Sequence, residues 1–415
     1  MNQSPPASGD IGGDKTVRKD HTSISELTLL FLRLGFTAFG GPAAHIALMK
    51  EEVVVRRQWL TETEFLDLLG ATNLIPGPNS TEMAIHIGYL RGRWIGLVVA
   101  GLCFILPAAF TVSAFAWAYI RFGRLPEVQG ILFGTKPVII AIILQAIAGL
   151  VRPAIKTPSG AILAITALVL ALLGFDELAL LFGAGLLSGL LRWSKPESGE
   201  RRRLRPLLML ILAAAAMISL PNLLTLLPTS LSSHTPAAGF SLSSLFFFFL
   251  KVGSVLYGSG YVLLAFLRDG LVNRWHWLSQ AQLLDAVTVG QITPGPVFTT
   301  ATFIGYILGG PKGALIATAG IFLPSFVFVA LSGPLIPRIR KSTLARAFLD
   351  GVNVAALALM AAVTLQLARE SITGIPSVVL ALASAVLLLR YRVNSTWLIL
   401  GGAVLGLVLS TLHIR

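Results

Sequence analysis

Residues 73–82 read NLIPGPNSTE and residues 291–300 read QITPGPVFTT, so that the same Pro-Gly-Pro recurs 218 positions later (294 − 76 = 218). This triplet interrupts a helix, because its two prolines donate no backbone hydrogen bond and its glycine is conformationally free. Inside a bilayer such a break is tolerated only where protein or a water-filled cavity covers the freed backbone groups. A break at corresponding places in two halves of a chain predicts the binding site of a transporter.

The composition indicates a membrane protein. Of 415 residues, 55% are hydrophobic and only 12% are charged, and the mean hydropathy is +0.80. Soluble domains carry about twice that charged fraction. Charge-free runs such as 138–151, 161–175 and 372–389 are typical of helices that cross a bilayer, each of which needs about 20 apolar residues. We therefore expect an all-α polytopic membrane protein with about thirteen transmembrane spans.

The net charge of +13 has a simple explanation in such a protein. Lys and Arg collect in short loops on the cytoplasmic side, so we expect no nucleic-acid partner, and their distribution places the N-terminus in the cytoplasm. Residues 1–25 are expected to form a disordered cytoplasmic tail. The single cysteine, Cys103, excludes a disulfide framework and a cysteine metal cluster. With no metal-ligand spacing, no cofactor motif and no P-loop, transport would depend on an ion gradient.

The similarity of the two halves extends well beyond Pro-Gly-Pro. Basic, acidic and glycine residues all recur at the same offset. The matched pairs are Arg33 and Lys251, Gly35 and Gly253, Gly40 and Gly258, Lys50 and Arg268, Glu51 and Asp269, and Asp67 and Asp285. After a one-residue slip the offset becomes 217, as for Gly88 and Gly305. We expect a first repeat at 26–195, a linker with one spacer span at 196–240, and a second repeat at 241–415. A displacement of seven spans inverts the second six-span repeat relative to the first, whereas one span more or fewer would make the repeats parallel.

The first break predicts an anion site. A helix from Glu64 should end there and another should begin near Asn79, and the free N–H groups at such a helix start bind oxyanions. Hydroxyl groups on the first turn would add donors in both halves. The alternative is a capped kink that only shapes the helix bundle. The candidate substrate-binding residues at the breaks are Pro76, Gly77, Pro78, Asn79, Ser80, Thr81, Pro294, Gly295, Pro296, Thr299 and Thr300.

Three residues are candidates for proton coupling: Glu82, Asp67 and His45. Glu82 has two interpretations. Its spacing from Asn79 is that of a capping box, whereas an acid at membrane depth is by default a functional candidate that could carry a proton. His45 could titrate near neutrality.

Arg33 and Lys251 each lie seven residues before a glycine that ends a helix, Gly40 (followed by Gly41) or Gly258. Seven residues of helix span about 10 Å, so both cations should lie within the hydrocarbon. Each then needs a partner, either Asp67 or Asp285 or a passing anion. A structural ion pair and direct substrate contact both remain open, and Arg33, Lys251, Gly40 and Gly41 are included among the substrate-binding candidates.

Long motifs of the chain resemble the chromate transporter family. In the first half these are FGGPAAHIALMKEEVVVRRQWL and NLIPGPNSTEMAIHIGYLRGRWIGLVVAGLCFILPA, and in the second half QITPGPVFTTATFIGYILGG followed by LPSF. The resemblance covers about residues 25–415. It implies a long, two-domain member that exports chromate across the bacterial inner membrane, driven by the proton-motive force. The second half departs from the family pattern at Gly258-Ser259-Gly260 and at Val297-Phe298.

The sequence thus favours a proton-coupled antiporter for a tetrahedral oxyanion, without an enzymatic activity. Its partners would be chromate or a sulfate-like oxyanion, protons and the lipid bilayer, and a homodimer is left open. Alternatives in the same class are a sulfate or other oxyanion carrier and a proton-independent anion exchanger. An intramembrane enzyme acting on a lipid phosphate would need a nucleophile–base pair or a metal cluster at the break. A passive channel would not require paired, interrupted repeats.

Overall fold

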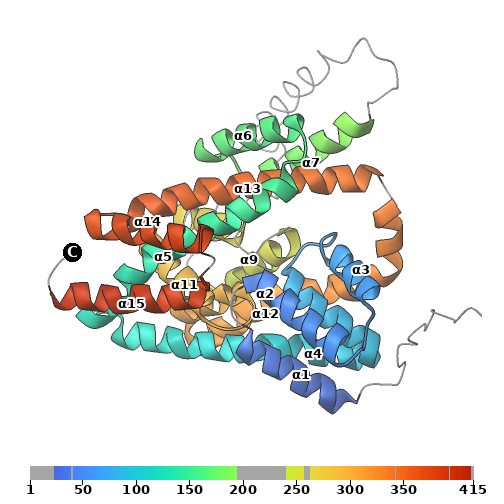
Figure 1. The fold of residues 1–415 in the computed structure, drawn as a ribbon, viewed down its shortest axis with the longest axis horizontal. Coiled ribbons are helices and arrows are strands. Elements are labelled where there is room, and N and C mark those ends of the chain that lie inside the picture. Colours follow the sequence, from blue (N-terminus) through green and yellow to red (C-terminus); the bar gives the residue numbers. More distant parts are fainter. Residues whose placement is uncertain are drawn as a thin grey trace, which may run out of the picture.

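The computed structural model describes residues 23–38, 41–193, 240–256, 262–341, 343–391 and 393–412. Within these ranges the regular structure is entirely helical, which confirms the all-α prediction (Figure 1). Four helices are long and apolar enough to cross a membrane: Asn79–Phe122, Pro126–Ala154, Val297–Ser332 and Leu344–Ser371. Five further apolar helices of 10–17 residues accompany them.

The helices follow the same order in the two halves of the chain. The first half contains α1 (Ile24–Thr37), α2 (Gly41–Lys50), η1 (Glu51–Arg56), α3 (Glu62–Thr72), α4 (Asn79–Phe122), α5 (Pro126–Ala154), α6 (Pro158–Leu172) and α7 (Glu177–Trp193). The second half contains α9 (Leu242–Val255), α10 (Leu263–Leu267), η3 (Arg268–Arg274), α11 (Gln280–Ile292), η4 (Val297–Thr299), α12 (Thr300–Lys341), α13 (Thr343–Ser371), α14 (Ile375–Leu389) and α15 (Ser395–Thr411).

Backbone details recur with the same offset. Gln58 and His276 both have φ near +50° (276 − 58 = 218). A capping box of Thr61 and Glu64 starts α3, and one of Ser279 and Gln282 starts α11. The resemblance between the halves is therefore one of chain course as well as sequence.

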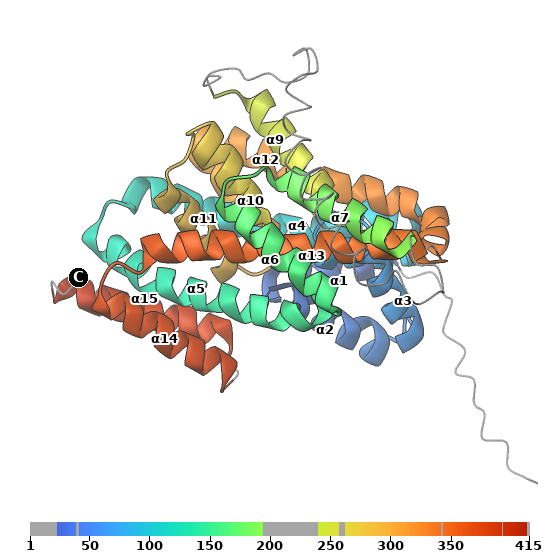
Figure 2. The same ribbon diagram turned by 90° about the horizontal axis from the view of Figure 1, so that it is seen from above.

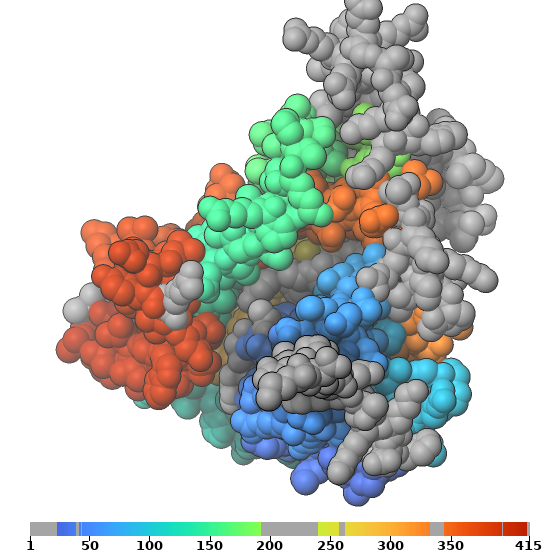
Figure 3. Space-filling view, turned by 45° about the vertical axis from the view of Figure 1, so that its right-hand side comes forward, coloured from blue at the N-terminus to red at the C-terminus, as the bar shows by residue number. Residues whose placement is uncertain are grey.

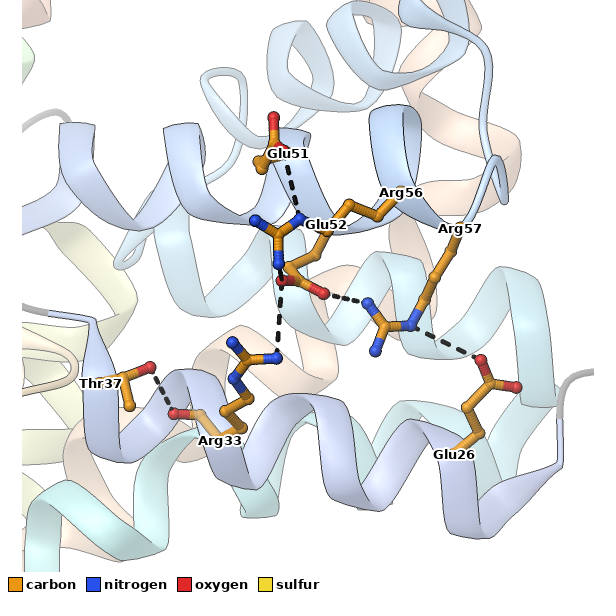
Figure 4. Close-up of polar contacts among 7 residues, drawn as sticks. All are labelled: Glu26, Arg33, Thr37, Glu51, Glu52, Arg56 and Arg57. Carbon is orange, nitrogen blue, oxygen red and sulfur yellow. Dashed lines mark hydrogen bonds and ion pairs between the residues drawn. The ribbon is translucent and has the colours of Figure 1, made fainter.

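Six of the expected spans are too short to cross a membrane alone. The helices at the spans expected around Leu34, Ile75, Leu168, Leu250, Ile292 and Leu382 contain 14, 11, 15, 14, 13 and 15 residues. Fifteen residues extend about 22 Å, less than the hydrocarbon thickness of about 30 Å. In the first half, α1 and the α2–η1 segment lie antiparallel as a hairpin (Figure 4). The count of thirteen spans is thus not confirmed, and the expected spacer span near Leu212 lies outside the described residues.

Helices α4 and α12 are each bent into two antiparallel pieces. The bends lie at Gly92 and Arg93 in α4 and at Gly309 and Gly310 in α12, where the backbone leaves helical geometry. After each bend a glycine packs directly on the carbonyl of a glycine before it, so that Gly88 faces Gly96 and Gly305 faces Gly313. Close approach of backbones at small residues is how helices associate within lipid. Residues 73–91 therefore complete a second hairpin with α3, whose tip is the first Pro-Gly-Pro.

The halves interlock through their last helices. Helices α6 and α7 of the first half pack on α13 of the second, and α14 and α15 of the second pack on α5 of the first (Figure 1). Figure 2 shows the same exchange from above. The largest core cluster accordingly joins both halves and includes Ile139 and Ile143 of the first and Val352 and Ala355 of the second. A second core cluster, which includes Phe31 and Phe104, lies within the first half.

The Gly88–Gly96 contact gives a stability prediction. A Cβ on Gly88 would overlap the Gly96 carbonyl, so Gly88→Ala forces the hairpin apart. We expect the midpoint of thermal unfolding in detergent to fall by at least about 3 °C, as is typical of overpacking. Gly149→Ala in α5 is the matched control, because nothing lies within 4 Å of its Cβ position. Equal midpoints for the two variants would contradict the close packing.

Candidate functional site

Each Pro-Gly-Pro break is held by the opposite half of the chain. The Gly77 N–H donates to the Leu256 carbonyl at 2.8 Å, and the Gly295 N–H donates to the Ala38 carbonyl at 2.9 Å. Ala38 and Leu256 themselves correspond (256 − 38 = 218) and end helices α1 and α9. Gly77 (φ +139°) and Gly295 (φ +91°) adopt conformations that L side chains rarely adopt. The reciprocal bonds therefore bring the tips of hairpins from both halves together.

These tips lie at the middle of the long helices. The Cβ position of Gly77 is 2.8 Å from Ser325 Oγ, and that of Gly295 is 2.6 Å from Ala108 Cβ. Ala108 is midway along the part of α4 that follows its bend (residues 94–122), and Ser325 lies in the part of α12 that follows its bend, within the apolar span that ends at Ser332. Both breaks thus lie near mid-depth of the helices that are long enough to cross.

A cavity of about 460 Å³ reaches the first break. Figure 3 shows its mouth as a hollow bordered by the blue α2–α3 region, green α5 and orange α13. Both halves supply its walls: Pro42, Ile46, Asn73, Pro78, Asn79, Ser80, Leu150, Pro153, Ala154 and Lys156, together with Val262, Val297, Phe298, Asn353, Ala356, Leu357 and Met360. A cavity of this size holds a small ion with part of its hydration shell.

The inner end of the cavity is the start of α4. Helix α3 ends at Thr72 and α4 begins at Asn79, as predicted from the sequence. The first intrahelical bonds of α4 run from the Thr81 and Glu82 N–H groups to the Pro78 carbonyl. The N–H groups of Asn79 and Ser80 precede these bonds and lie at the positive end of the helix dipole. This end of the cavity can therefore bind an anion.

His45 connects the cavity wall to the second break. Its ring is buried, with Nε2 3.0 Å from the Ala38 carbonyl and Nδ1 3.2 Å from Ser80 Oγ. Because a carbonyl only accepts, Nε2 carries the proton and Nδ1 accepts from the Ser80 hydroxyl in the neutral ring. The same Ala38 carbonyl accepts from Gly295. A hydrogen-bonded path thus runs from Ser80 in the first half to the Pro-Gly-Pro of the second.

The capping-box interpretation of Glu82 is wrong. Pro78, not Asn79, is the N-cap of α4, and no side chain caps the helix. The Glu82 carboxyl is fully buried and packs on Gly77 beside Ser325 of the second half. Among the described residues, neither carboxyl oxygen has a hydrogen-bond partner, and the same is true of Thr81 Oγ1 and Ser325 Oγ. The first break therefore buries an unsatisfied polar group, which is costly without a functional reason.

The second break has different chemistry. The Thr299 hydroxyl donates to the Pro296 carbonyl and the Thr300 hydroxyl to the Val297 carbonyl, each at 2.8 Å. Their hydroxyl protons are thus already used within the turn. Val297 and Phe298 occupy the positions that Asn79 and Ser80 hold in the first half. The polar cavity end therefore belongs to the first break.

Arg33 and Lys251 lie outside the cavity lining. The Arg33 side chain is 59% exposed and pairs with Glu52 at 3.8 Å, a partner that was not expected. Arg56 and Arg57 also bind Glu52, which fastens α1 to η1 (Figure 4). Of the expected partners, Asp285 pairs with Lys136 instead, and Asp67 is exposed on α3. Gly40 is outside the described residues, while Gly41 (φ +77°) begins α2.

Several residues of this region were not predicted. Ser325 lies in the LPSF motif, where the repeat offset aligns it with the apolar Ala108 and so hides it. Lys156 lines the cavity, with its Nζ 2.9 Å from Asp350 Oδ1. Among the described residues, no three His, Cys, Asp or Glu side chains are grouped to hold a metal ion.

Comparison with known proteins shows one family. The chromate transporter family model matches residues 25–190 and again residues 243–407. A chromate transport protein of Cupriavidus metallidurans is 34% identical over 412 residues, covering 98% of both chains. A probable chromate transport protein of Synechococcus elongatus is 31% identical, covering 88% of this chain and 89% of its own. An uncharacterized transporter of Methanocaldococcus jannaschii is 27% identical over 95% of this chain and 96% of its own. No solved structure shows a significant match.

The His45 network predicts a graded loss of stability. His45→Ala leaves the Ser80 hydroxyl without its acceptor and removes one of two donors to the Ala38 carbonyl. We expect a loss of about 1–3 kcal/mol, measured as a lower midpoint of thermal unfolding. His45→Gln should retain much of the stability, because its amide offers both a donor and an acceptor. A His45→Ala midpoint equal to that of the wild type would show that the network contributes nothing.

Proposed function

The chain belongs to the chromate transporter family, and on that premise we propose that it is a secondary active transporter that exports chromate across the bacterial inner membrane in exchange for protons. One observation carries the proposal. A cavity walled by both halves leads to the start of α4, where backbone N–H groups lie at the positive end of the helix dipole and the buried acid Glu82 follows three residues after Asn79. This arrangement suits binding and coupling rather than bond cleavage.

We propose that the halves are inverted relative to each other in the membrane. Two contacts along α4 support this. Gly92, at the bend, faces Ile24 and Leu27 of α1, whereas Tyr119 near the end of α4 bonds to Asp285 of α11. Helices of the two halves therefore meet α4 at opposite ends of its second piece, as an inverted arrangement would require. With the N-terminus in the cytoplasm, the cavity, which lies between the end of α5 and the start of α13, opens to the cytoplasm.

The anion would be held by dipoles. Chromate is a tetrahedral dianion, and the N–H groups of Asn79 and Ser80, with the amide of Asn73, present donors at the inner end of the cavity. Lys156 at the wall would draw anions in, since its pairing with Asp350 is exposed and therefore weak. Neutral donors suffice to select a tetrahedral oxyanion and do not separate chromate from sulfate.

The proton would be carried by Glu82. Its carboxyl is buried without a partner among the described residues, so the neutral acid is the form that fits this conformation. It is four residues from the Pro78 carbonyl that begins α4, and so lies next to the anion site. For the exchange proposed here the two ligands must alternate, so the neutral acid would belong to the anion-free return step and would release its proton to the cytoplasm before the anion is carried outward. Asp67 is exposed on α3, whereas Glu82 is buried two residues after Ser80 of the cavity wall, which favours Glu82, and His45, bonded to Ser80, is the second candidate.

Flux in proteoliposomes tests the function. Radiolabelled chromate should move against its gradient when a pH gradient is imposed and stop when a protonophore removes that gradient. Sulfate in excess serves as competitor and shows whether the site separates the two dianions. Chromate flux equal to that of protein-free liposomes would overturn the proposal.

Ser80→Ala should weaken binding of the anion. The Ser80 hydroxyl lines the cavity and donates to His45 Nδ1, so binding an anion would turn its proton from a neutral acceptor, worth about 1 kcal/mol, to a charged one, worth about 1.5–3 kcal/mol. The difference of about 1 kcal/mol predicts a rise in the KM for chromate of about fivefold. Ser113→Ala, elsewhere on α4 and bonded only to the Ala109 carbonyl, is the matched control and should keep the wild-type KM. An unchanged KM for Ser80→Ala would remove Ser80 from the site.

Glu82→Gln should uncouple transport from the pH gradient. The amide is close in shape to the neutral acid but releases no proton, so the protein should still exchange chromate while losing uphill transport. The measurement is chromate accumulation with and without an imposed pH gradient. Glu127→Gln, on the exposed first turn of α5, is the control with the same chemical change. Accumulation by Glu82→Gln that still follows the gradient would assign the proton to another group.

A further inference from the structure

A second charged cluster lies on the side of the molecule opposite the cavity mouth. Lys136 of α5 places its Nζ 2.9 Å from Asp285 Oδ1 of α11, and the Tyr119 hydroxyl of α4 donates to Asp285 Oδ2 at 2.8 Å. The side chains of Lys136 and Asp285 are only 20% and 6% exposed. The cluster therefore ties two long helices of the first half to the broken helix of the second.

An ion pair in this environment needs an explanation. Removing both charges from water costs more than their attraction usually returns, and apolar residues would hold the helices together at least as well. Charged residues within membrane-spanning helices commonly mark the path of an ion. The cluster is thus a candidate for a step of transport.

The repeat identifies the residues of the second half that correspond to Lys136 and its neighbours. Lys136 corresponds to Asn353 (353 − 136 = 217), and Asn353 lines the open cavity. Ile140 and Ile143 likewise correspond to Leu357 and Met360 of the cavity wall (357 − 140 = 217; 360 − 143 = 217). Leu357 and Met360 border that cavity although they are themselves only 7% and 1% exposed, whereas Ile140 and Ile143, 1% and 0% exposed, lie in the core cluster and outside the cavity lining. Equivalent residues therefore border a cavity in the second half and are packed in the core in the first half, where Lys136 is bound to Asp285.

We propose that Lys136 is a second anion-binding residue, which faces the transport pathway when the opposite side opens. In that conformation Lys136 occupies the place that Asn353 has now, and the anion replaces the Asp285 carboxylate as its partner. Tyr119 then keeps the hydroxyl bond that holds Asp285. When Asp285 returns to Lys136, the anion is expelled and this side closes. The identity of the anion rests on the proposed function, whereas the exchange of partners at Lys136 does not.

Site-directed labelling tests the closure. Cys103 is the only cysteine of the chain, so Cys103→Ala gives a background for single reporters. A maleimide should label Leu357→Cys, on the open side, and leave Ile140→Cys unlabelled. Adding Asp285→Asn should raise the labelling rate of Ile140→Cys about tenfold and lower that of Leu357→Cys. The charge exchange Lys136→Asp with Asp285→Lys should restore protection of Ile140→Cys.

Unchanged labelling of Ile140→Cys in folded Asp285→Asn protein would overturn the closure. Folding is checked by gel filtration and thermal unfolding. If Asp285→Asn does not fold, Tyr119→Phe is used instead, which removes one hydrogen bond and leaves the ion pair. The labelling rate of Ile140→Cys should then rise about threefold. An unchanged labelling rate in Tyr119→Phe would also overturn the proposed closure.

Anion protection tests the binding role. In the Asp285→Asn background, chromate or sulfate should slow labelling of Ile140→Cys by about tenfold. The protection should vanish with Lys136→Gln and persist with Lys136→Arg, which keeps the charge. Protection that survives Lys136→Gln would remove Lys136 from the pathway. If sulfate protects Ile140→Cys but the protein transports no chromate, chromate is rejected as the transported anion, whereas the anion-binding role of Lys136 is supported.

Discussion

The structure depends on one constraint, which is that a helix broken inside a bilayer must find partners for its freed backbone groups. This chain finds them by exchange between its halves. Gly77 donates to Leu256 and Gly295 donates to Ala38, so each break is completed by the helix end of the other half. The interlocked packing of α6–α7 on α13 and of α14–α15 on α5 follows the same rule on a larger scale. Two halves that complete each other's breaks necessarily meet at mid-depth, and a cavity at their junction is a consequence of that meeting.

On this paired scaffold the chemistry is asymmetric. The first break carries Ser80 and Glu82 and faces Ser325, whereas the second carries Phe298 and Thr300 and faces Ala108. At the second break the Thr299 and Thr300 hydroxyls are hydrogen-bonded within the turn. At the first break the Thr81 hydroxyl and the Glu82 carboxyl have no hydrogen-bond partner among the described residues. The two copies thus share the backbone geometry of the break and differ in the side chains that it presents.

Short sequence motifs predicted the features that neighbouring residues determine. Pro-Gly-Pro predicted the two helix breaks, and these in turn predicted the start of α4 at Asn79. The cap at Glu82 was wrong because Pro78 already occupies the N-cap, which leaves Asn79 inside the helix where its side chain is misplaced for capping. The partner of Arg33 was missed because hydropathy gives depth and not the neighbour, and Glu52 approaches only after α1 and η1 fold back. Ser325 lies 248 positions from Gly77 (325 − 77 = 248), and the repeat pairs Ser325 with Ala108 (325 − 217 = 108), so it gives no sign of the contact with Gly77.

Two lysines, one within α5 and one just after it, explain why the cavity lies where it does. Lys136 and Lys156 are 20 residues apart (156 − 136 = 20), and each is paired with a carboxylate of the second half, Asp285 or Asp350. The Lys156 pair is exposed, at 61% and 44%, and such pairs contribute about 0–1 kcal/mol. The Lys136 pair is buried, so that separating it without a substitute partner leaves two uncompensated charges. Without an anion, the side held by Lys136 therefore stays closed and the side held by Lys156 opens. An anion that can take the place of Asp285 removes that difference, so the cargo itself supplies the free energy that lets the closed side open.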